Sequence, residues 1–110
     1  MPQLIFRGIP AEGIRAISVP LVVEMAEICQ CGTDNFTLEC LHVTAIFDGK
    51  YTDSYPFIDV WWFERGDEVR DKMADAIDRH IRSLGIPDLE ISFRVGREDN
   101  FYMNGRRYDS

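Results

Sequence analysis

The strongest constraint on the fold is a hydrophobic pattern that occurs twice: a long stretch of helical periodicity lies between two short apolar stretches. Residues 11–30 carry apolar side chains every three or four positions, which predicts an amphipathic helix whose buried face is Ile14, Ile17, Leu21, Met25 and Ile28. A second helical pattern follows Asp67 and Glu68, acidic residues that the helix dipole favours in a first turn. Its predicted core face consists of Val69, Met73, Ala76, Ile77 and Ile81.

Four segments around these helices have the composition of β-strands: Pro2–Arg7, Phe36–Phe47, Phe57–Phe63 and Leu89–Val95. The chain is therefore expected to follow the order β-α-β-β-α-β. The third strand is apolar except for Asp59, a pattern typical of a strand that is covered on both faces.

Local irregularities are expected at three places. Pro20 predicts a kink or a short break in the first helix, because proline lacks the N–H that a helix interior requires. Within residues 36–47 the apolar positions change parity, so we expect a bulge or bend near Cys40. Residues 48–50 predict a turn, and the segment that follows to Tyr55 is expected to be a loop.

The two halves of the chain align on each other with a shift of 55 residues, half of its 110 residues. Such a repeat predicts two similar units, about residues 2–47 and 56–96, with a tail over 97–110. We expect a single domain over residues 1–110 of the α+β (α/β) class. In this duplicated β-α-β fold, two helices pack on a four-stranded mixed sheet.

Charge and composition exclude several kinds of partner. The chain has 12 Lys and Arg residues against 19 Asp and Glu residues, a net charge of −7. Nucleic acids and anionic membrane surfaces require a concentrated basic face, so we expect neither as a partner. No apolar run approaches the ~20 residues of a membrane span, and the amino terminus does not resemble a signal peptide.

The cysteines Cys29, Cys31 and Cys40 are odd in number and are not spaced like the disulfide framework of a secreted protein. This usage predicts a reducing, cytoplasmic location. Cys29 and Cys31 would need more ligands to hold a metal ion than His42 and His80 provide. We therefore expect no metal and no cofactor, and we interpret the thiols as inert and partly buried.

Pro2 directly follows the initiator methionine, and this position gives it potential chemistry. Removal of Met1 would leave a secondary amine at the chain terminus, whereas retention of Met1 would leave an amide without basicity. An α-amino group has a pKa of about 7.7–8.0, and apolar surroundings lower it further because they disfavour the cation. Such an amine is a general base near neutral pH, suited to removing a proton next to a carbonyl group.

Several stretches resemble the tautomerase superfamily, which includes macrophage migration inhibitory factor and 4-oxalocrotonate tautomerase. Residues 63–70 resemble the strand-turn-helix junction of the short tautomerases, where an arginine binds a carboxylate substrate. Closer resemblance is to a bacterial family of tautomerase-like proteins, domain of unknown function 1904. It is carried by residues 1–7, 35–39, 55–63 and 101–105.

This resemblance implies keto-enol isomerisation of a small carbonyl acid by a homotrimer, with pockets at subunit boundaries and Pro2 as the general base. The resemblance assigns the substrate carboxylate to Arg65. Glu39 stands where the short tautomerases have a second arginine, which argues against a di-acid substrate. With Arg65, we expect Glu39, Arg94 and Tyr102 to bind the substrate.

Other interpretations of the same residues remain open. Asp59 is either a pocket acid or half of a structural ion pair with Arg7 or Arg94. The chain could be a catalytically silent trimer that binds a small molecule or a protein, which the free or blocked state of Pro2 would decide. A ferredoxin-like module has the same linear order of elements, but a tautomerase pairs the two strands of each β-α-β unit in parallel.

Overall fold

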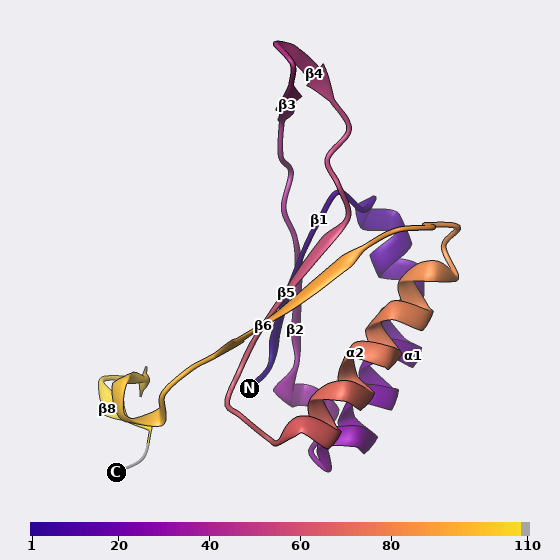
Figure 1. Ribbon diagram of the computed structural model, residues 1–110. Helices are drawn as coiled ribbons and strands as arrows, with labels where there is room; N and C mark the ends of the chain where they lie inside the picture. Colours follow the sequence, from indigo (N-terminus) through magenta and orange to yellow (C-terminus); the bar gives the residue numbers. More distant parts are fainter. Residues whose placement is uncertain (109–110) are drawn as a thin grey trace.

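The computed structural model describes residues 1–108 and places two helices on one face of a four-stranded sheet (Figure 1). The helices are α1 (Ala11–Cys29) and α2 (Asp67–Arg82), with 3-10 turns η1 (Thr33–Asn35) and η2 (Glu98–Asn100). The sheet is formed by β1 (Gln3–Arg7), β2 (Thr37–Cys40), β5 (Phe57–Trp62) and β6 (Glu90–Val95). Two hairpins lie outside it: β3 (Ala45–Phe47) with β4 (Lys50–Thr52), and β7 (Tyr102–Met103) with β8 (Arg106–Arg107).

The strand order of the sheet is β2-β1-β5-β6. β1 pairs in parallel with β2, and β5 pairs in parallel with β6, so each β-α-β unit joins its own two strands. The units meet where β1 and β5 pair antiparallel. This pairing excludes the ferredoxin-like arrangement, and it confirms the predicted mixed sheet with two helices.

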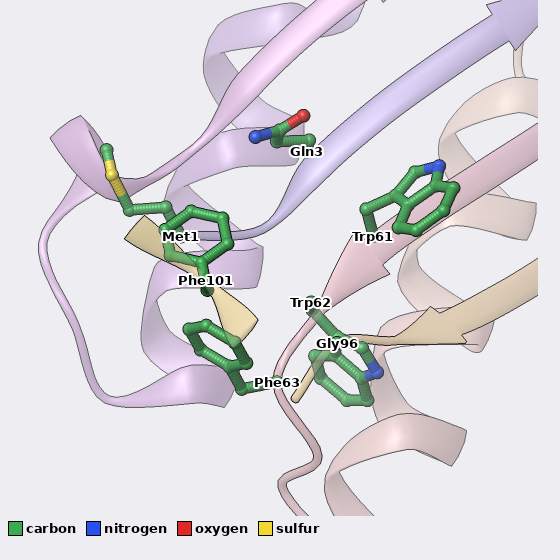
Figure 2. Close-up of a pocket in the computed structure, with 7 residues that line it drawn as sticks. All are labelled: Met1, Gln3, Trp61, Trp62, Phe63, Gly96 and Phe101. Atoms are coloured by element: carbon green, nitrogen blue, oxygen red, sulfur yellow. The ribbon is translucent and has the colours of Figure 1, made fainter. Parts of the chain in front are cut away.

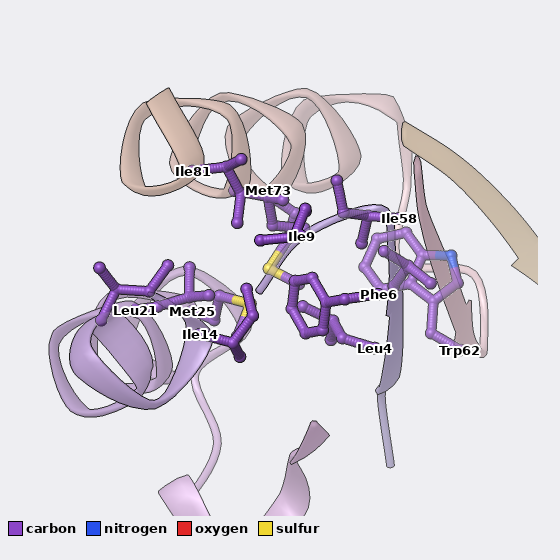
Figure 3. Packing of buried hydrophobic residues seen from close by; sticks show 13 residues of the cluster. Leu4, Phe6, Ile9, Ile14, Leu21, Met25, Ile58, Trp62, Met73 and Ile81 are labelled. Carbon is purple, nitrogen blue, oxygen red and sulfur yellow. The ribbon is translucent and has the colours of Figure 1, made fainter. Parts of the chain in front are cut away.

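The core lies between the sheet and the two helices (Figure 3). Alternate residues of the central strands point into it, and Leu4, Phe6, Ile58 and Val60 have no exposed surface. The predicted apolar face of α2 is confirmed by four buried residues: Met73, Ala76, Ile77 and Ile81. Each large buried side chain contributes about 1.5–3 kcal/mol of hydrophobic free energy, so this interface holds the helices on the sheet.

Within residues 1–108, no helix covers the opposite face of the sheet (Figure 1). Gln3 and Trp61 are register partners on this face, as are Ile5 and Asp59. The side chain of Trp61 is 45% exposed. The expectation that β5 is covered on both faces is therefore wrong for the single chain, because two helices suffice for one face only.

α1 runs through Pro20 without the expected break. Pro20 is exposed on the solvent side of the helix. Water can therefore bond the carbonyl oxygen of Ala16, which proline leaves without its helical donor. The buried face at Ile17 and Leu21 stays in contact with the sheet, which holds both halves of the helix in line.

The predicted single strand over residues 36–47 is wrong, because β2 ends at Cys40, where the apolar parity changes. The chain then leaves the sheet and forms an arm, residues 41–55, that projects beyond it (Figure 1). The expected turn at Asp48 and Gly49 has the positive φ angles, 53° and 71°, of a two-residue hairpin connection. It joins β3 to β4, so part of the expected loop before Tyr55 is a strand.

Candidate active site

Pro2 lies at the start of β1, in the interior of the molecule. Its side chain is fully buried, whereas the preceding Met1 is 47% exposed. The carbonyl oxygen of Pro2 accepts a hydrogen bond of 3.1 Å from the backbone N–H of Thr37. The junction of β1 and β2 therefore fixes the position of Pro2.

A pocket of about 260 Å³ opens beside the amino terminus (Figure 2). Its walls are mainly aromatic and apolar: Met1, Gln3, Trp61, Trp62, Phe63, Gly96 and Phe101. Three elements build it, because Gln3 belongs to β1, the aromatic run comes from β5 and its end, and Phe101 comes from the carboxyl-terminal tail. An apolar pocket with few polar groups is the usual form of a small-molecule site.

The tail is held at this pocket by aromatic packing. The rings of Phe101 and Tyr108 lie 5.3 Å and 5.0 Å from that of Phe63. Figure 2 shows the rings of Phe63 and Phe101 next to each other at the pocket. Gly96 packs against the same ring, because a Cβ atom there would lie 3.4 Å from Cε1 of Phe63, at van der Waals contact.

The amino-terminal ammonium of Met1 has a pKa below its ordinary value. Burial is the main cause, because it disfavours the cation, and the positive charge of Arg65 acts in the same direction. The thiols of Cys31 and Cys29 oppose this shift of the pKa. The chain terminus, Arg65 and two cysteines therefore form one electrostatic group.

Arg65 occupies the turn between β5 and α2. Its Nη1 donates a hydrogen bond of 3.3 Å to the carbonyl oxygen of Phe63, and its guanidinium carbon lies 5.5 Å from the centre of the Trp62 ring. Among residues 1–108, no carboxylate forms an ion pair with Arg65. Its neighbour Arg70 instead bonds Glu64 and Asp67, at 2.9 Å and 2.6 Å.

None of the five predicted site residues is among those that line the pocket, and Arg65 lines a separate groove between α1 and α2. Glu39 is exposed on β2, at the register position of Ile5. Arg94 lies 5.4 Å from the ring centre of Trp61, a pocket residue, and bonds Asp59. Tyr102 is 60% exposed on the tail beside Phe101. Pro2 and Arg65 thus adjoin the lining residues Met1 and Trp62, and Arg94 and Tyr102 adjoin Trp61 and Phe101. Glu39 belongs to β2, which contributes no residue to the lining.

Sequence reasoning assigned no place in a pocket to five of its lining residues: Met1, Gln3, Phe63, Gly96 and Phe101. Gln3 becomes recognisable once the pairing of β1 with β5 is known, because that register sets it opposite Trp61. Phe101 and Gly96 lie outside the strands of the sheet, so no hydrophobic periodicity in the sequence predicts that they line a pocket.

Within the described part of the chain, no three His, Cys, Asp or Glu side chains are grouped so that they could hold a metal ion. In the same residues, no helix is long and apolar enough to cross a membrane. The three cysteines are free, and each is half-buried.

Comparison with known proteins assigns the chain to a family. The family model described as a domain of unknown function (DUF1904) matches residues 1–107. A crystal structure of such a domain from Sebaldella termitidis is 34% identical, with a TM-score of 0.88 over 96% of this chain and 97% of that one. No curated protein sequence matches the chain.

More distant structures share the fold. A fused 4-OT, described as an asymmetric trimer, has a TM-score of 0.81 at 14% identity and covers 97% of this chain and 96% of its own. A macrophage migration inhibitory factor-like protein from Entamoeba histolytica has a TM-score of 0.64 at 17% identity, over 96% of both chains. The chain therefore belongs to the DUF1904 family, and it has the fold of the tautomerase superfamily.

Proposed function

We propose that this protein, once Met1 is removed, is a tautomerase that interconverts the keto and enol forms of a small carbonyl acid. The single observation that carries the proposal is the position of Pro2, buried at the start of β1 directly after a residue that lines the aromatic pocket. Loss of Met1 places the nitrogen of Pro2 at the wall of that pocket. No metal or cofactor takes part in the proposed reaction.

The proposed base moves one proton between two atoms of the substrate. The secondary amine of Pro2 takes a proton from the enol oxygen or the α-carbon of the substrate and returns it to the other atom. Burial and Arg65 lower the pKa of the Met1 ammonium, and we expect the same two causes to lower the pKa of the Pro2 amine once Met1 is removed. A neutral amine near pH 7 is the form that a general base requires.

Arg65 is the proposed binding group for the substrate carboxylate. Its guanidinium is free of acidic partners among the described side chains, and it lies against Trp62 at the pocket wall. A planar guanidinium can hold a carboxylate through two parallel hydrogen bonds. Glu39, Arg94 and Tyr102 are proposed to act at the margin of the site, where a neighbouring subunit would bring them closer to the substrate.

We also propose that the protein is a homotrimer in the cytoplasm. The arm exposes large apolar side chains, with Phe47 at 77%, Tyr51 at 85% and Ile46 at 67%. The radius of gyration is 15.2 Å, above the about 13 Å of a compact domain of 100 residues, because the arm and tail extend from the body. Exposed apolar surface of this kind is usually covered by association, and three free thiols suit a reducing compartment.

The alternative proposal is a catalytically silent trimer whose aromatic pocket binds a small molecule or a protein. The exposed surface of Met1 at the pocket favours it if Met1 is retained, because its side chain then forms part of the binding wall. In that case the nitrogen of Pro2 is an amide and takes no part in proton transfer.

The pH–rate profile of the processed protein tests the tautomerase proposal. Intact-mass spectrometry first establishes that Met1 has been removed, and phenylpyruvate then serves as the assay substrate. The rate is expected to rise with pH, with a midpoint below the ordinary α-amino pKa. Pro2→Ala should lose only part of the rate, because its primary amine still accepts a proton. A rate without pH dependence between about pH 5 and pH 9, a range around the ordinary α-amino pKa and below it, contradicts the proposal.

A further inference from the structure

Two cysteines, Cys29 and Cys31, flank the residue that caps the end of α1. The helix ends at Cys29, and Gln30 has the left-handed backbone angles φ 54° and ψ 50°. The N–H of Cys31 bonds the carbonyl oxygen of Ala26 at 3.0 Å, which turns Cys31 back under the last helical turn. Burial raises the pKa of the Cys29 thiol, and the neighbouring thiol of Cys31 acts in the same direction.

The backbone distance between these cysteines suits a disulfide. Consecutive Cα atoms are about 3.8 Å apart, and the helical angles of Gln30 bend the path between Cys29 and Cys31. Their Cα atoms therefore lie closer than the ~7 Å beyond which a disulfide cannot form without backbone movement. Cys40 belongs to β2 and has no such partner within the described residues.

The thiol pair adjoins the candidate active site. Both cysteines act electrostatically on the amino-terminal ammonium, as does Arg65. Cys29 and Arg65 line the same open groove between the end of α1 and the start of α2, so small solutes can reach Cys29, and Cys31 is itself partly exposed. On its inner side, the thiol of Cys29 donates a hydrogen bond of 3.7 Å to Sδ of Met73, which holds it in place.

We propose that Cys29 and Cys31 are a redox-sensitive dithiol, which hydroperoxides convert to an intramolecular disulfide at the edge of the candidate active site. Most cytoplasmic disulfides are transient and serve redox sensing or catalysis, and a pair beside a reactive amine fits that use.

The oxidation is a two-electron reaction with a hydroperoxide as the oxidant. Cys31 attacks the hydroperoxide as the thiolate, the O–O bond breaks, and the alcohol or water leaves with the thiol proton. This gives a sulfenic acid on Cys31. The sulfur of Cys29 then attacks the sulfenic sulfur, an S–S bond forms, and hydroxide departs as water with the proton of Cys29. A small thiol such as dithiothreitol reverses the reaction by thiol–disulfide exchange.

The effect of this disulfide on turnover rests on the proposed function. Three groups face the terminal amine: Cys29 at the end of α1, Cys31 just after it, and Arg65 at the turn before α2. The pKa of the amine is lowered and burial raises the pKa of the Cys29 thiol, so this thiol is uncharged where the amine titrates. A disulfide is uncharged as well, so oxidation is expected to leave the midpoint of the pH–rate profile in place.

The test treats the folded, full-length protein with one equivalent of hydrogen peroxide. The wild type should lose the mass of two hydrogen atoms, and its three free thiols should fall to one. Peptide mapping should locate the bond between Cys29 and Cys31, and dithiothreitol should reverse the change. Cys40→Ser is the matched control that keeps the mass loss, whereas Cys31→Ser and Cys29→Ser should each abolish it.

Two results overturn the proposal: no mass loss in the wild type under these conditions, or a bond that involves Cys40 or a second chain. These readouts do not depend on turnover. A protein that forms the disulfide but has no tautomerase activity contradicts the proposed function alone. One with pH-dependent turnover and no disulfide contradicts the dithiol alone.

Discussion

Nε of Arg94 donates a hydrogen bond of 3.0 Å to Oδ1 of Asp59, across the paired strands β6 and β5. The Asp59 side chain is only 13% exposed, so it depends on this partner for the solvation it has lost. The ion pair expected for Asp59 is therefore confirmed with Arg94. It also explains why one acid interrupts the apolar strand β5.

Arg94→Ala should destabilise the protein by about 1–2 kcal/mol, because it leaves the half-buried carboxylate of Asp59 without its donor. Asp59→Asn in the Arg94→Ala background should recover part of this loss, since it removes the unpaired charge. Urea unfolding at a fixed protein concentration measures both. Arg15→Ala is the control, because Arg15 and its partner Glu12 are highly exposed and contribute little. Equal losses for the two arginines would show that the Asp59 pair has no special role.

Arg65→Ala should raise KM for phenylpyruvate about 10-fold or more, because a hydrogen bond to a charged group contributes about 1.5–3 kcal/mol. It should also move the midpoint of the pH–rate profile upward, because the variant loses a positive charge that lowers the pKa of the amine. Arg65→Lys keeps that charge and should leave the midpoint in place. It should still weaken binding, because an ammonium group lacks the planar fork. Arg79→Ala, on the far helix surface, serves as the control and should change neither quantity.

Glu24 links the two helices through Arg79 and through Nε2 of His80, at 3.0 Å. The hydrogen bond from Arg79 is the main reason that the pKa of Glu24 lies below its ordinary value. Because the folded pKa is depressed, the stabilisation is present above the ordinary pKa of glutamate. It is lost as the pH falls through the folded pKa. Glu24→Gln should therefore cost up to about 1 kcal/mol at pH 7 in thermal or urea unfolding, and this cost should shrink as the pH falls below the ordinary pKa of glutamate and through the folded pKa. A cost that stays constant as the pH falls would contradict the ionic origin.

Phe47→Asp should dissociate the proposed trimer, because Phe47 is 77% exposed in the single chain and would be covered only by a neighbour. Light scattering should give three times 12.7 kDa for the wild type and a smaller mass for the variant. Val19→Asp changes a similarly exposed apolar residue on α1, away from the arm, and should remain a trimer. A wild type that stays at 12.7 kDa on dilution rules out the assembly.

The order of elements and the core could be predicted from the sequence, because the apolar residues that recur with helical or strand spacing are the ones that are buried. Met73, Ile77 and Ile81 recur at helical spacing and are buried in α2, and the even residues of β1 are buried. The arm could not be predicted, because residues 41–47 keep the apolar alternation of a strand although β2 ends at Cys40. Whether two repeats underlie residues 2–47 and 56–96 stays a prediction.

The candidate site was predictable only in part. Pro2 and Arg65 carry chemistry that the sequence itself displays, and the structure brings both to the end of the molecule that holds the aromatic pocket. Gly96 and Phe101 line the pocket because the tail folds back onto Phe63, a tertiary contact without a local pattern. The thiol pair depends on the left-handed turn at Gln30, which the spacing of Cys29 and Cys31 does not reveal.

The central claim is that the amine of Pro2 is the base, and one comparison tests it most directly. Two forms of the same chain are needed, one with Met1 removed and one with Met1 retained, each verified by intact mass. Their rates of phenylpyruvate enol conversion are then measured side by side at neutral pH. The account predicts turnover by the processed form and none by the form with Met1, because an amide nitrogen cannot accept the proton. Equal rates for the two forms would contradict it.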